Sequence, residues 1–380
     1  MKIGSPKESK EQEFRVGLTP ESVVQLVQAG HEVWIERGAG VGIGADDEEY
    51  IKAGAKIAED MPGLMARVEL VVKVKEPTAE ERRCLTPEHT LFAYLHLASD
   101  PAQASELMAS RAICIAYETV TDDEGRLPLL APMSEIAGRL AVQAAADHLV
   151  KHRGGRGVLL GGATGVPAAK VVIIGGGVVG SNAALIAQGL GARVTVLDKS
   201  SERLGEIGEE FSNRAGNPLE LVLSTEGVLA EQVREADLVV GAVLVPGGKA
   251  AKLITAGMVK SMRPGTVIAD VAIDQGGCCE NSRPTTHAEP TYLVDGVIHY
   301  CVANIPGAVP LTSSLALNRV TLPQVMKLAD EGVVSALKGA PHLLDGLNVC
   351  GGKITREEVA RDLGLEFTEP LVALNSITGN

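Results

Sequence analysis

Aromatic residues are scarce in this sequence, at 3% of 380 residues. Proteins that bind single-stranded nucleic acids stack the bases on aromatic side chains, so the shortage argues against that function. Positive charge is in deficit as well, because the formal net charge is -13 at pH 7 and a phosphate backbone needs a basic face. We therefore expect no nucleic-acid partner, and we interpret the acidity as an aid to solubility.

Long apolar runs and paired cysteines are also missing. No stretch of about 18 apolar residues is present that could span a bilayer. The first residues lack the apolar core and cleavage site of a secretory signal. The six cysteines form no C-x-x-C pair, so neither a zinc ribbon nor a thioredoxin-like site is indicated. We expect a cytoplasmic protein without a membrane partner, whose thiols stay reduced, those of Cys278 and Cys279 included.

The composition is that of a folded protein, with 45% apolar and 22% charged residues, and the length suggests two domains. In the first part, short apolar runs alternate with stretches of helical character. Strands are expected at 31–36, 69–74, 90–94 and 112–116, and helices at 20–29, 47–53, 78–83 and 101–109. Continuous apolar strands that alternate with helices indicate a parallel sheet covered on both faces, here over residues 1–130.

A second unit of the same kind is expected over residues 131–305. It begins with a long Ala-rich helix at 133–152, for which Ser134 is the expected N-cap. Strands are expected at 170–174, 193–197, 238–243, 266–269 and 298–302. Residues 306–380 look helical, without strands of their own, and should return to the first unit. The predicted fold is therefore α/β, with two Rossmann-like doubly wound parallel-sheet domains separated by a cleft, 1–130 plus 306–380 and 131–305.

A glycine-rich turn follows the expected strand at 170–174. Gly175-x-Gly177-x-x-Gly180 opens a helix expected at 181–190, and the next strand is followed by Asp198, 18 residues after Gly180. Gly175 allows the tight turn, Gly177 the close approach of a pyrophosphate, and Gly180 close helix–strand packing. The carboxylate of Asp198 suits the ribose hydroxyls and repels a 2′-phosphate. The pattern predicts an NAD site, although Lys199 and Arg203 weaken the argument against NADP.

Ligands of open α/β sheets bind beyond the carboxyl ends of the strands. In the first unit that rule selects Lys75, His96 and Arg15, each of which follows an expected strand. Alone, each is more often a solvated or structural side chain. Together they suit a small carboxylate substrate, because cations hold the carboxylate and the imidazole can pass protons. In the second unit Asp270 and Asp274 both follow a strand, and position alone does not choose between them.

These residues stand in a chain that resembles the alanine dehydrogenase family, of which the NAD-binding portion of proton-translocating transhydrogenase is a relative. The resemblance extends over nearly the whole sequence. It is carried by Gly4-x-Pro6-x-Glu8, Glu13-Phe-Arg-Val16, Val72-Lys-Val-Lys-Glu-Pro77, Leu95-His-Leu97, Ala116-Tyr-Glu-Thr119, Leu129-Leu-Ala-Pro-Met-Ser-Glu135, Gly241-Ala-Val-Leu-Val-Pro246, Asp274-Gln-Gly-Gly277, Ser282-Arg-Pro-Thr-Thr286 and Tyr300-Cys-Val-Ala-Asn304.

The resemblance implies that Arg15 and Lys75 bind the substrate and that His96 and Asp274 are the catalytic groups. It also implies a homo-hexamer and an NAD site. With the motif glycines, the expected NAD contacts are Ser134, Gly175, Gly177, Val178, Val179, Gly180, Asp198, Arg203, Ser224, Val243, Leu244, Val271, Asp274, Val302, Asn304 and Ile305.

The sequence departs from the family at two places. Some members carry a magnesium site built from Glu and His on a C-terminal helix, where this chain has Lys327 and Glu331, so no metal is expected. Ile305 replaces the methionine of some relatives, which should change packing near the nicotinamide.

The implied reaction is the reversible oxidation of L-alanine to pyruvate and ammonia by NAD, with hydride leaving the alanine Cα. A transhydrogenase subunit is the nearest alternative, followed by a dehydrogenase acting on another amino acid such as saccharopine. A non-catalytic NAD-sensing module would bind NADH without turning over an amino acid.

Overall fold

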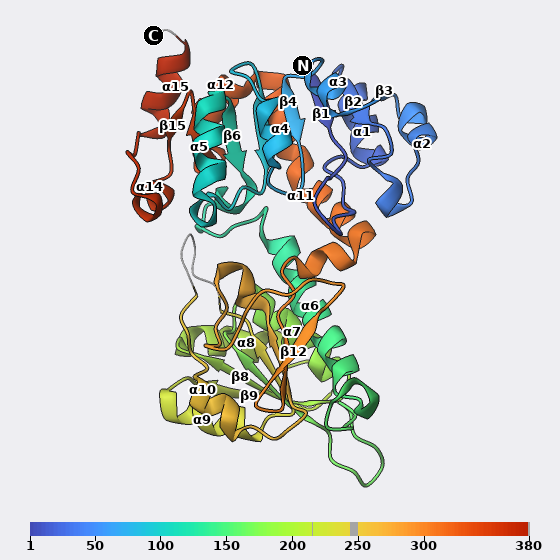
Figure 1. Ribbon diagram of the computed structural model, residues 1–380, viewed down its shortest axis with the longest axis vertical. Helices are drawn as coiled ribbons and strands as arrows, with labels where there is room; N and C mark the ends of the chain where they lie inside the picture. The colour runs from blue at the N-terminus through green and yellow to red at the C-terminus, as the bar shows by residue number, and fades with distance from the viewer. Residues whose placement is uncertain (215, 244–249, 379–380) are drawn as a thin grey trace. The chain divides into compact units, whose positions relative to one another are not determined.

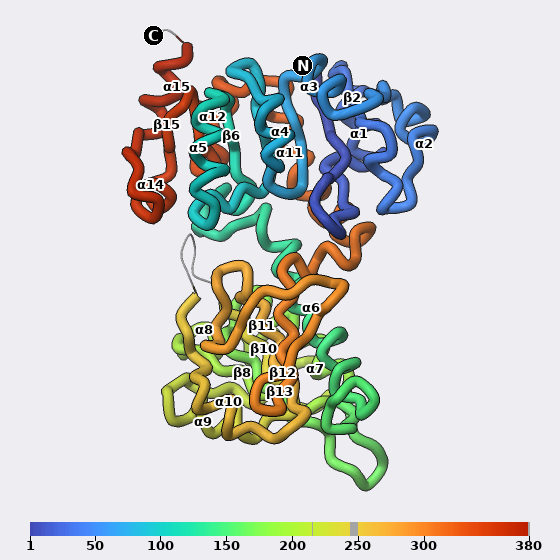
Figure 2. The backbone as a smooth tube through the Cα atoms, in the orientation of Figure 1, coloured from blue at the N-terminus to red at the C-terminus, as the bar shows by residue number. Residues whose placement is uncertain are grey.

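The computed structural model describes residues 1–214, 216–243 and 250–378. By internal contacts it divides into two compact units. Unit 1 comprises Met1–Met133 and Val309–Asn380, and unit 2 comprises Ser134–Ala308. Figure 2 shows the C-terminal segment, in orange and red, running among the blue and cyan segments of unit 1.

Unit 1 is built on a sheet with the strand order β15-β14-β6-β5-β4-β1-β2-β3. Its strands are β1 (Lys2–Ser5), β2 (Glu32–Glu36), β3 (Lys56–Ala58), β4 (Leu70–Val72), β5 (Thr90–Ala93), β6 (Ile113–Ala116), β14 (Leu347–Cys350) and β15 (Lys353–Ile354). The strands β1 to β6 pair in parallel, whereas β14 is antiparallel to both β6 and β15.

Helices flank this sheet, with α4 and α5 in front of the strands and α11 behind them in Figure 1. They are α1 (Pro20–Gln28), α2 (Asp47–Lys52), α3 (Met61–Met65), α4 (Ala79–Arg83), α5 (Pro101–Ser110), α11 (Pro310–Glu331), α12 (Val333–Gly339), α13 (Pro341–Leu344), α14 (Glu357–Leu363) and α15 (Pro370–Thr378). The first five begin where a polar side chain accepts a hydrogen bond from the first turn. These N-caps are Thr19, Asp46, Asp60, Thr78 and Asp100.

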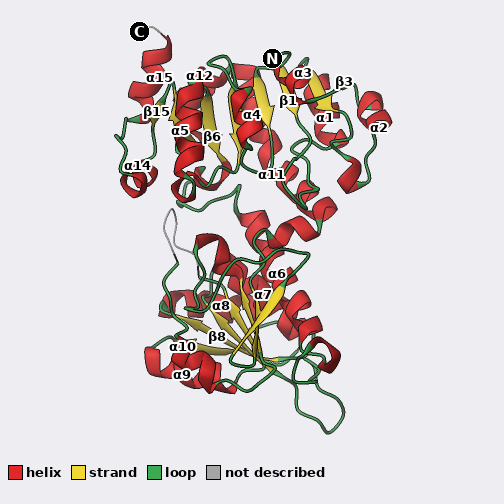
Figure 3. Ribbon diagram, viewed as in Figure 1, coloured by secondary structure: helices red, strands yellow, loops and turns green. Residues whose placement is uncertain are grey.

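Unit 2 has the strand order β12-β13-β11-β10-β7-β8-β9, and among these strands of the described residues only β12 and β13 pair antiparallel. Its strands are β7 (Lys170–Ile174), β8 (Arg193–Asp198), β9 (Glu220–Leu223), β10 (Leu238–Gly241), β11 (Val267–Asp270), β12 (Thr291–Val294) and β13 (Val297–Tyr300). Its helices are α6 (Ala131–His148), which begins in the last residues of unit 1, α7 (Val178–Gly189), α8 (Ser201–Phe211), α9 (Glu226–Glu235) and α10 (Ala256–Ser261). Figure 3 shows the strands in yellow with helices around them.

The central strand β7 shows why this sheet needs helices on both faces. Val171 and Ile173 belong to one buried cluster, with residues of α6 and α7, and Val172 and Ile174 belong to another, with residues of α9 and α10. Successive side chains of a strand point to opposite faces, so a continuous apolar run fills two cores at once. The prediction of two doubly wound α/β units is confirmed, with antiparallel strands added at the sheet edges.

Three local predictions were wrong. The C-terminal segment is not purely helical, because β14 and β15 extend the sheet of unit 1. The helix expected from 133 begins at Ala131, so Ser134 lies inside its first turn and does not cap it. The helix after the glycine-rich turn starts at Val178, directly after its N-cap Gly177, and not at Ser181.

Both sheets share one topological feature that places ligand sites. Read across the sheet from the edge strands β3 and β9, β3-β2-β1-β4-β5-β6 and β9-β8-β7-β10-β11-β13 follow the same order, in which the first strand of each set along the chain lies beside the fourth. The chain leaves these two neighbouring strands in opposite directions and opens a crevice at their carboxyl ends. Candidate sites are therefore expected beyond β1 and β4 in unit 1, and beyond β7 and β10 in unit 2. No helix of the described residues is long and apolar enough to cross a membrane.

Candidate active site

A buried ion cluster closes the gap beyond β1 and β4. The Lys73 ammonium, directly after β4, donates to Glu8 Oε2 at 2.9 Å and to Glu81 Oε1 at 3.1 Å. Its side chain is only 1% exposed. Burial lowers the pKa of Lys73, but the two carboxylates outweigh burial and leave it raised. Because Val74 N also donates to Glu8 Oε1 at 2.7 Å, this cluster fixes the backbone that leads to Lys75.

Arg15 follows Glu8 on the same connection and is buried, with a side chain 2% exposed. Its Nε donates to Glu13 Oε1 at 2.7 Å and its Nη2 to Glu13 Oε2 at 2.5 Å, a bidentate pair. Its Nη1 lies 3.2 Å from Met133 Sδ. The structure thus brings Arg15 to the predicted end of the sheet, with one edge of its guanidinium held by Glu13.

Lys75 and His96 lie around one carboxylate, that of Glu76. Lys75 Nζ is 3.6 Å from Glu76 Oε2, and Lys10 donates to Glu76 Oε1. Burial raises the pKa of Glu76, but the charges of Lys75, His96 and Lys10 together lower it to about 2. Glu76 is therefore ionised at neutral pH and compensates the positive charge of this site.

His96 is the most exposed of the three predicted unit 1 residues, with 41% of its side chain accessible. Its ring stacks on that of Tyr94, with centroids 5.9 Å apart and planes at 5°. Tyr94 is buried, which raises its pKa, and its hydroxyl donates to Leu129 O at 2.7 Å. Arg15 and Glu118 both act on the Tyr94 hydroxyl electrostatically, so Arg15, Tyr94 and His96 form one neighbourhood.

In unit 2 the glycine-rich turn has the geometry expected of a phosphate-binding loop. Gly175 has φ +99°, which L side chains rarely adopt, and a Cβ at Gly180 would collide with the Gly175 carbonyl oxygen. A Cβ at Gly177 would meet no atom within 4 Å, so the backbone there faces open space. Because Gly177 is also the N-cap of α7, the free N–H groups of the first turn are available to an anion. The residues present fit a dinucleotide pyrophosphate.

Asp198, the last residue of β8, reaches back to this turn. Its Oδ2 accepts from Gly176 N at 2.7 Å and its Oδ1 from Ser200 N at 2.9 Å. Arg203 donates from Nε to Gly176 O at 2.7 Å and from Nη2 to Ser181 Oγ at 3.2 Å, and its Nη1 pairs with Glu206. The guanidinium that weakened the argument against NADP is thus engaged by protein groups.

The other predicted cofactor residues mostly follow carboxyl ends of strands in the same sheet. Ser224 follows β9 and its N–H donates to Asp198 O at 2.8 Å. Val243 follows β10 and Val271 follows β11. Further along the chain, Val302, Asn304 and Ile305 follow β13. Val178 and Val179 form the first turn of α7, and Ser134 lies on α6, away from the strand ends in sequence. Leu244 lies outside the described residues.

The two aspartates after β11 differ sharply in surroundings. Asp270 is fully buried, and its carboxylate accepts from Cys278 N, Cys279 N and Ser282 Oγ, the last at 2.6 Å. Asp274 lies in the 3₁₀ turn Val271–Gln275 and is exposed. Asp270 thus ties the following loop together, while Asp274 presents its carboxylate to solvent.

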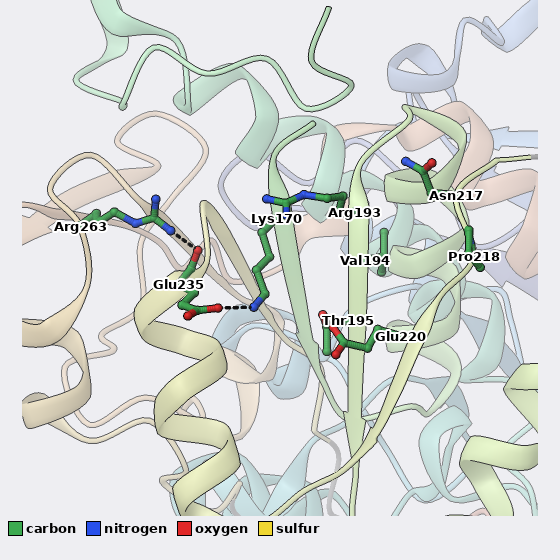
Figure 4. A pocket seen from close by; sticks show the side chains of 9 residues that line it. All are labelled: Lys170, Arg193, Val194, Thr195, Asn217, Pro218, Glu220, Glu235 and Arg263. Carbon is green, nitrogen blue, oxygen red and sulfur yellow. Dashed lines mark hydrogen bonds and ion pairs between the residues drawn. The ribbon is translucent and has the colours of Figure 1, made fainter. Parts of the chain in front are cut away.

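A hollow of about 510 Å³ lies elsewhere on unit 2, and Figure 4 shows the side chains that line it. Lys170 and Arg193, at the starts of β7 and β8, put it at the amino ends of the strands, the opposite edge from the glycine-rich turn. Lys170 donates to Glu235 Oε2 at 2.9 Å and Arg263 donates to the Glu235 carbonyl oxygen. Its location and internal pairing make it a poor candidate for the reaction site.

Two further sequence features can be placed. All six cysteines are free thiols, and burial raises the pKa of Cys278 and Cys279, which makes both unreactive. On α11, Lys327 Nζ donates to Glu331 Oε1 at 2.7 Å, so an ammonium group occupies the side of Glu331 that faces the preceding turn.

Models of one protein family match almost the whole chain. The alanine dehydrogenase/PNT N-terminal domain matches residues 4–137, and the C-terminal domain of the same family matches residues 141–357. The chain belongs to this family. The resemblance to this family, proposed from the sequence motifs, is thereby confirmed for both parts of the chain.

Relatives in the alanine dehydrogenase/PNT family cover the chain end to end. The alanine dehydrogenase of Halomonas elongata is 54% identical over 97% of this chain and 98% of its own. That of Bacillus subtilis is 50% identical over 98% of both chains. A solved L-alanine dehydrogenase has a TM-score of 0.91 at 49% identity, covering 96% of this chain and 99% of its own. A transhydrogenase of Sinorhizobium meliloti, 24% identical over 94% of this chain and 99% of its own, shares the fold with a TM-score of 0.79.

Sequence reasoning gave no role to Glu76, Tyr94 or Glu118, although Glu76 and Glu118 stand in the family motifs and Tyr94 directly precedes one. Glu76 and Glu118 each follow the carboxyl end of a strand, β4 and β6. The strand-end rule that selected Lys75 and His96 in unit 1 would have selected both glutamates, had it been applied there to acids, as it was to Asp270 and Asp274 in unit 2.

The buried cluster predicts a large stability loss in Lys73→Met. Removing the ammonium leaves two buried carboxylates without a cation, which should lower the free energy of unfolding by about 3–5 kcal/mol. Lys327→Met is the matched control, because it removes a lysine from an exposed pair and should cost less than about 0.5 kcal/mol. Urea unfolding followed by circular dichroism compares them. Equal stability of the two variants would contradict the role given to Lys73.

Proposed function

We propose that the protein is an NAD-dependent alanine dehydrogenase, which oxidises L-alanine to pyruvate and ammonia and runs the reaction in reverse. The near-complete match to alanine dehydrogenases at about 50% identity carries the proposal. The cations and the imidazole at the end of the unit 1 sheet support it, as does the glycine-rich turn of unit 2. The likeness to transhydrogenase rests on fold alone and favours no second function.

In this proposal Lys75 and Arg15 hold the carboxylate of alanine. Lys75 supplies a partly accessible ammonium, with 16% of its side chain exposed. Arg15 adds the charge of its guanidinium, which Glu13 holds at Nε and Nη2 and which lies against Met133 at Nη1. Fixing the carboxylate at two cations orients the Cα hydrogen for transfer.

The cofactor residues we propose are those of the glycine-rich turn and of the strand ends around it. NAD, when bound, accepts the hydride that leaves Cα. Backbone N–H groups of the first turn of α7 hold the pyrophosphate, and Asp198 holds the ribose hydroxyls. The resemblance further implies Ser134, Ser224, Val243, Val271 and the segment 302–305, and we retain these as proposals together with Leu244.

Proton transfer is assigned to His96 and Asp274. Loss of the hydride leaves an imino acid, to which water must add before ammonia can leave. His96 accepts a proton from that water through its imidazole, and Asp274, whose carboxylate is exposed, exchanges the protons that follow. We propose that the enzyme works in the cytoplasm as a homo-oligomer, a hexamer by resemblance, without nucleic-acid or membrane partners.

The first test is activity itself. The purified protein should form NADH from L-alanine and NAD in preference to other L-amino acids, and His96→Ala should lower kcat by about 10²- to 10⁴-fold. Absorbance at 340 nm over a panel of amino acids, with saccharopine and glycine included, measures both. A protein that binds NADH but reduces NAD with no amino acid would instead be a sensing module, and one that only exchanges hydride between nucleotides would be a transhydrogenase.

The choice between the two aspartates has its own test. Asp274→Asn should lower kcat by about 100-fold or more and leave the melting temperature unchanged, since the side chain is exposed. Asp270→Asn should lower the melting temperature, because an amide cannot accept all three hydrogen bonds. Loss of turnover in Asp270→Asn at unchanged melting temperature, with an active Asp274→Asn, would reverse the assignment.

Cofactor preference depends on Asp198. Asp198→Asn keeps an acceptor for Gly176 N but removes the charge that repels a 2′-phosphate. The ratio of kcat/KM for NAD to that for NADP should fall by about 10- to 100-fold, equivalent to about 1.4–2.7 kcal/mol. Glu202→Gln, an exposed acid on α8, is the control and should leave the ratio unchanged. An unaltered ratio in Asp198→Asn would show that this carboxylate does not select the nucleotide.

A further inference from the structure

The backbone of His96 adopts a conformation that needs outside support. Its φ of 49° and ψ of 40° lie in the left-handed region, which residues with a Cβ rarely enter. Such conformations persist only where surrounding groups hold them, and they concentrate at functional sites. In this chain the residue concerned is the one proposed to transfer protons.

The carboxylate of Glu118 is the group that holds this backbone. Its Oε1 accepts from His96 N at 2.6 Å and from Leu95 N at 3.1 Å, and its Oε2 is 3.3 Å from Leu95 N. On the carbonyl side, Gln103 Nε2 donates to Leu95 O at 2.5 Å and Ser99 Oγ donates to His96 O at 2.8 Å. The N–H and C=O groups of both Leu95 and His96 are therefore held by hydrogen bonds from the protein.

The same carboxylate also acts on the imidazole ring. Glu118 Oε1 is 3.9 Å from His96 Nδ1, within the range of an ion pair when the ring is protonated. Only 15% of the Glu118 side chain is exposed, so water screens the attraction weakly. Glu76, which is itself close to Lys75 and Lys10, also interacts electrostatically with His96, and the ring of Tyr94 stacks against the imidazole.

We propose that Glu118 is the positioning residue of His96, holding its left-handed backbone and stabilising the imidazolium that forms when the ring accepts a proton. The inference rests on the proposed function, in which His96 transfers that proton. A neighbouring strand supplies the carboxylate, because Glu118 follows β6 and His96 follows β5, its parallel partner. The arrangement parallels the way a carboxylate orients and stabilises a catalytic histidine on other folds.

Two substitutions separate the backbone role from the charge. Glu118→Gln keeps an oxygen that can accept from the two N–H groups but removes the negative charge. We expect a roughly tenfold lower kcat, an unchanged KM for alanine and an unchanged melting temperature. The acid limb of the kcat/KM profile should move to lower pH, because the variant lacks the attraction between the carboxylate and the positively charged ring 3.9 Å away. Glu118→Ala removes both effects and should lower kcat by about 100-fold.

Glu69→Gln is the matched control, because Glu69 Oε2 also accepts a backbone N–H, that of Lys2 at 2.9 Å, at the other end of the strands. It should leave kcat and the pH profile unchanged. In a His96→Ala background, Glu118→Gln should cost nothing further, whereas an equal loss there would show a general structural role and overturn the proposal. A Glu118→Gln enzyme with wild-type kcat and pH profile would overturn it as well.

Failure of the proposed function would look different from these outcomes. If the unaltered protein oxidises no alanine, both the function and the role of Glu118 are wrong. If it does oxidise alanine and His96→Ala retains full turnover, the assignment of His96 fails and the positioning role fails with it. An active enzyme that depends on His96 but not on Glu118 contradicts the positioning role alone.

Discussion

The candidate site of unit 1 depends on one buried lysine. Lys73 stands immediately beyond β4, where the chain would otherwise separate from the connection that follows β1. Its ammonium joins Glu8 of that connection to Glu81 of α4, and Glu8 in turn accepts from Val74 N. Buried charges are costly unless they are paired and hydrogen-bonded. The three groups are therefore stable only in the paired arrangement that the structure shows. This cluster fixes the backbone that leads to Lys75, two residues further along the chain.

In unit 2 different groups occupy the corresponding crevice, beyond the carboxyl ends of β7 and β10. There the chain beyond β7 turns through glycines, and Asp198 fastens the turn through the N–H of Gly176. No ammonium is needed, because backbone N–H groups and the start of α7 supply the positive potential. Two sheets with one topology thus carry two kinds of site. One gathers charged side chains, which we propose hold a small carboxylate, and the other leaves backbone open, which we propose for a phosphate.

The parts of the fold that could be predicted are those with local signals. The strand at 170–174 and the turn after it combine an apolar run with glycines at fixed spacing, and the structure has both. The strands β14 and β15 were not predicted because they are short, lie next to glycines and pair with distant β6 or with each other. The start of α6 was misplaced because Ser134 is a good capping residue in the wrong position, three residues inside the helix.

In the candidate site, too, the residues that could be predicted are those with a local signal in the sequence. The strand-end rule found Lys75, His96 and Arg15, but not their acidic partners, since the pairing of Glu118 with His96 or of Lys73 with Glu8 joins separate connections. Nor could position in the sequence distinguish Asp270 from Asp274, whose difference lies in burial and hydrogen bonding contributed by residues 278–282.

In the proposed reaction, hydride passes directly from Cα of alanine to NAD. Incubation of the protein with 2-deuterio-L-alanine and NAD, followed by mass spectrometry and NMR of the nucleotide, tests it most directly. We expect NADH carrying one deuterium at C4 of the nicotinamide, formed in equal amount with pyruvate. Unlabelled NADH, or pyruvate formed without reduced nucleotide, would contradict it.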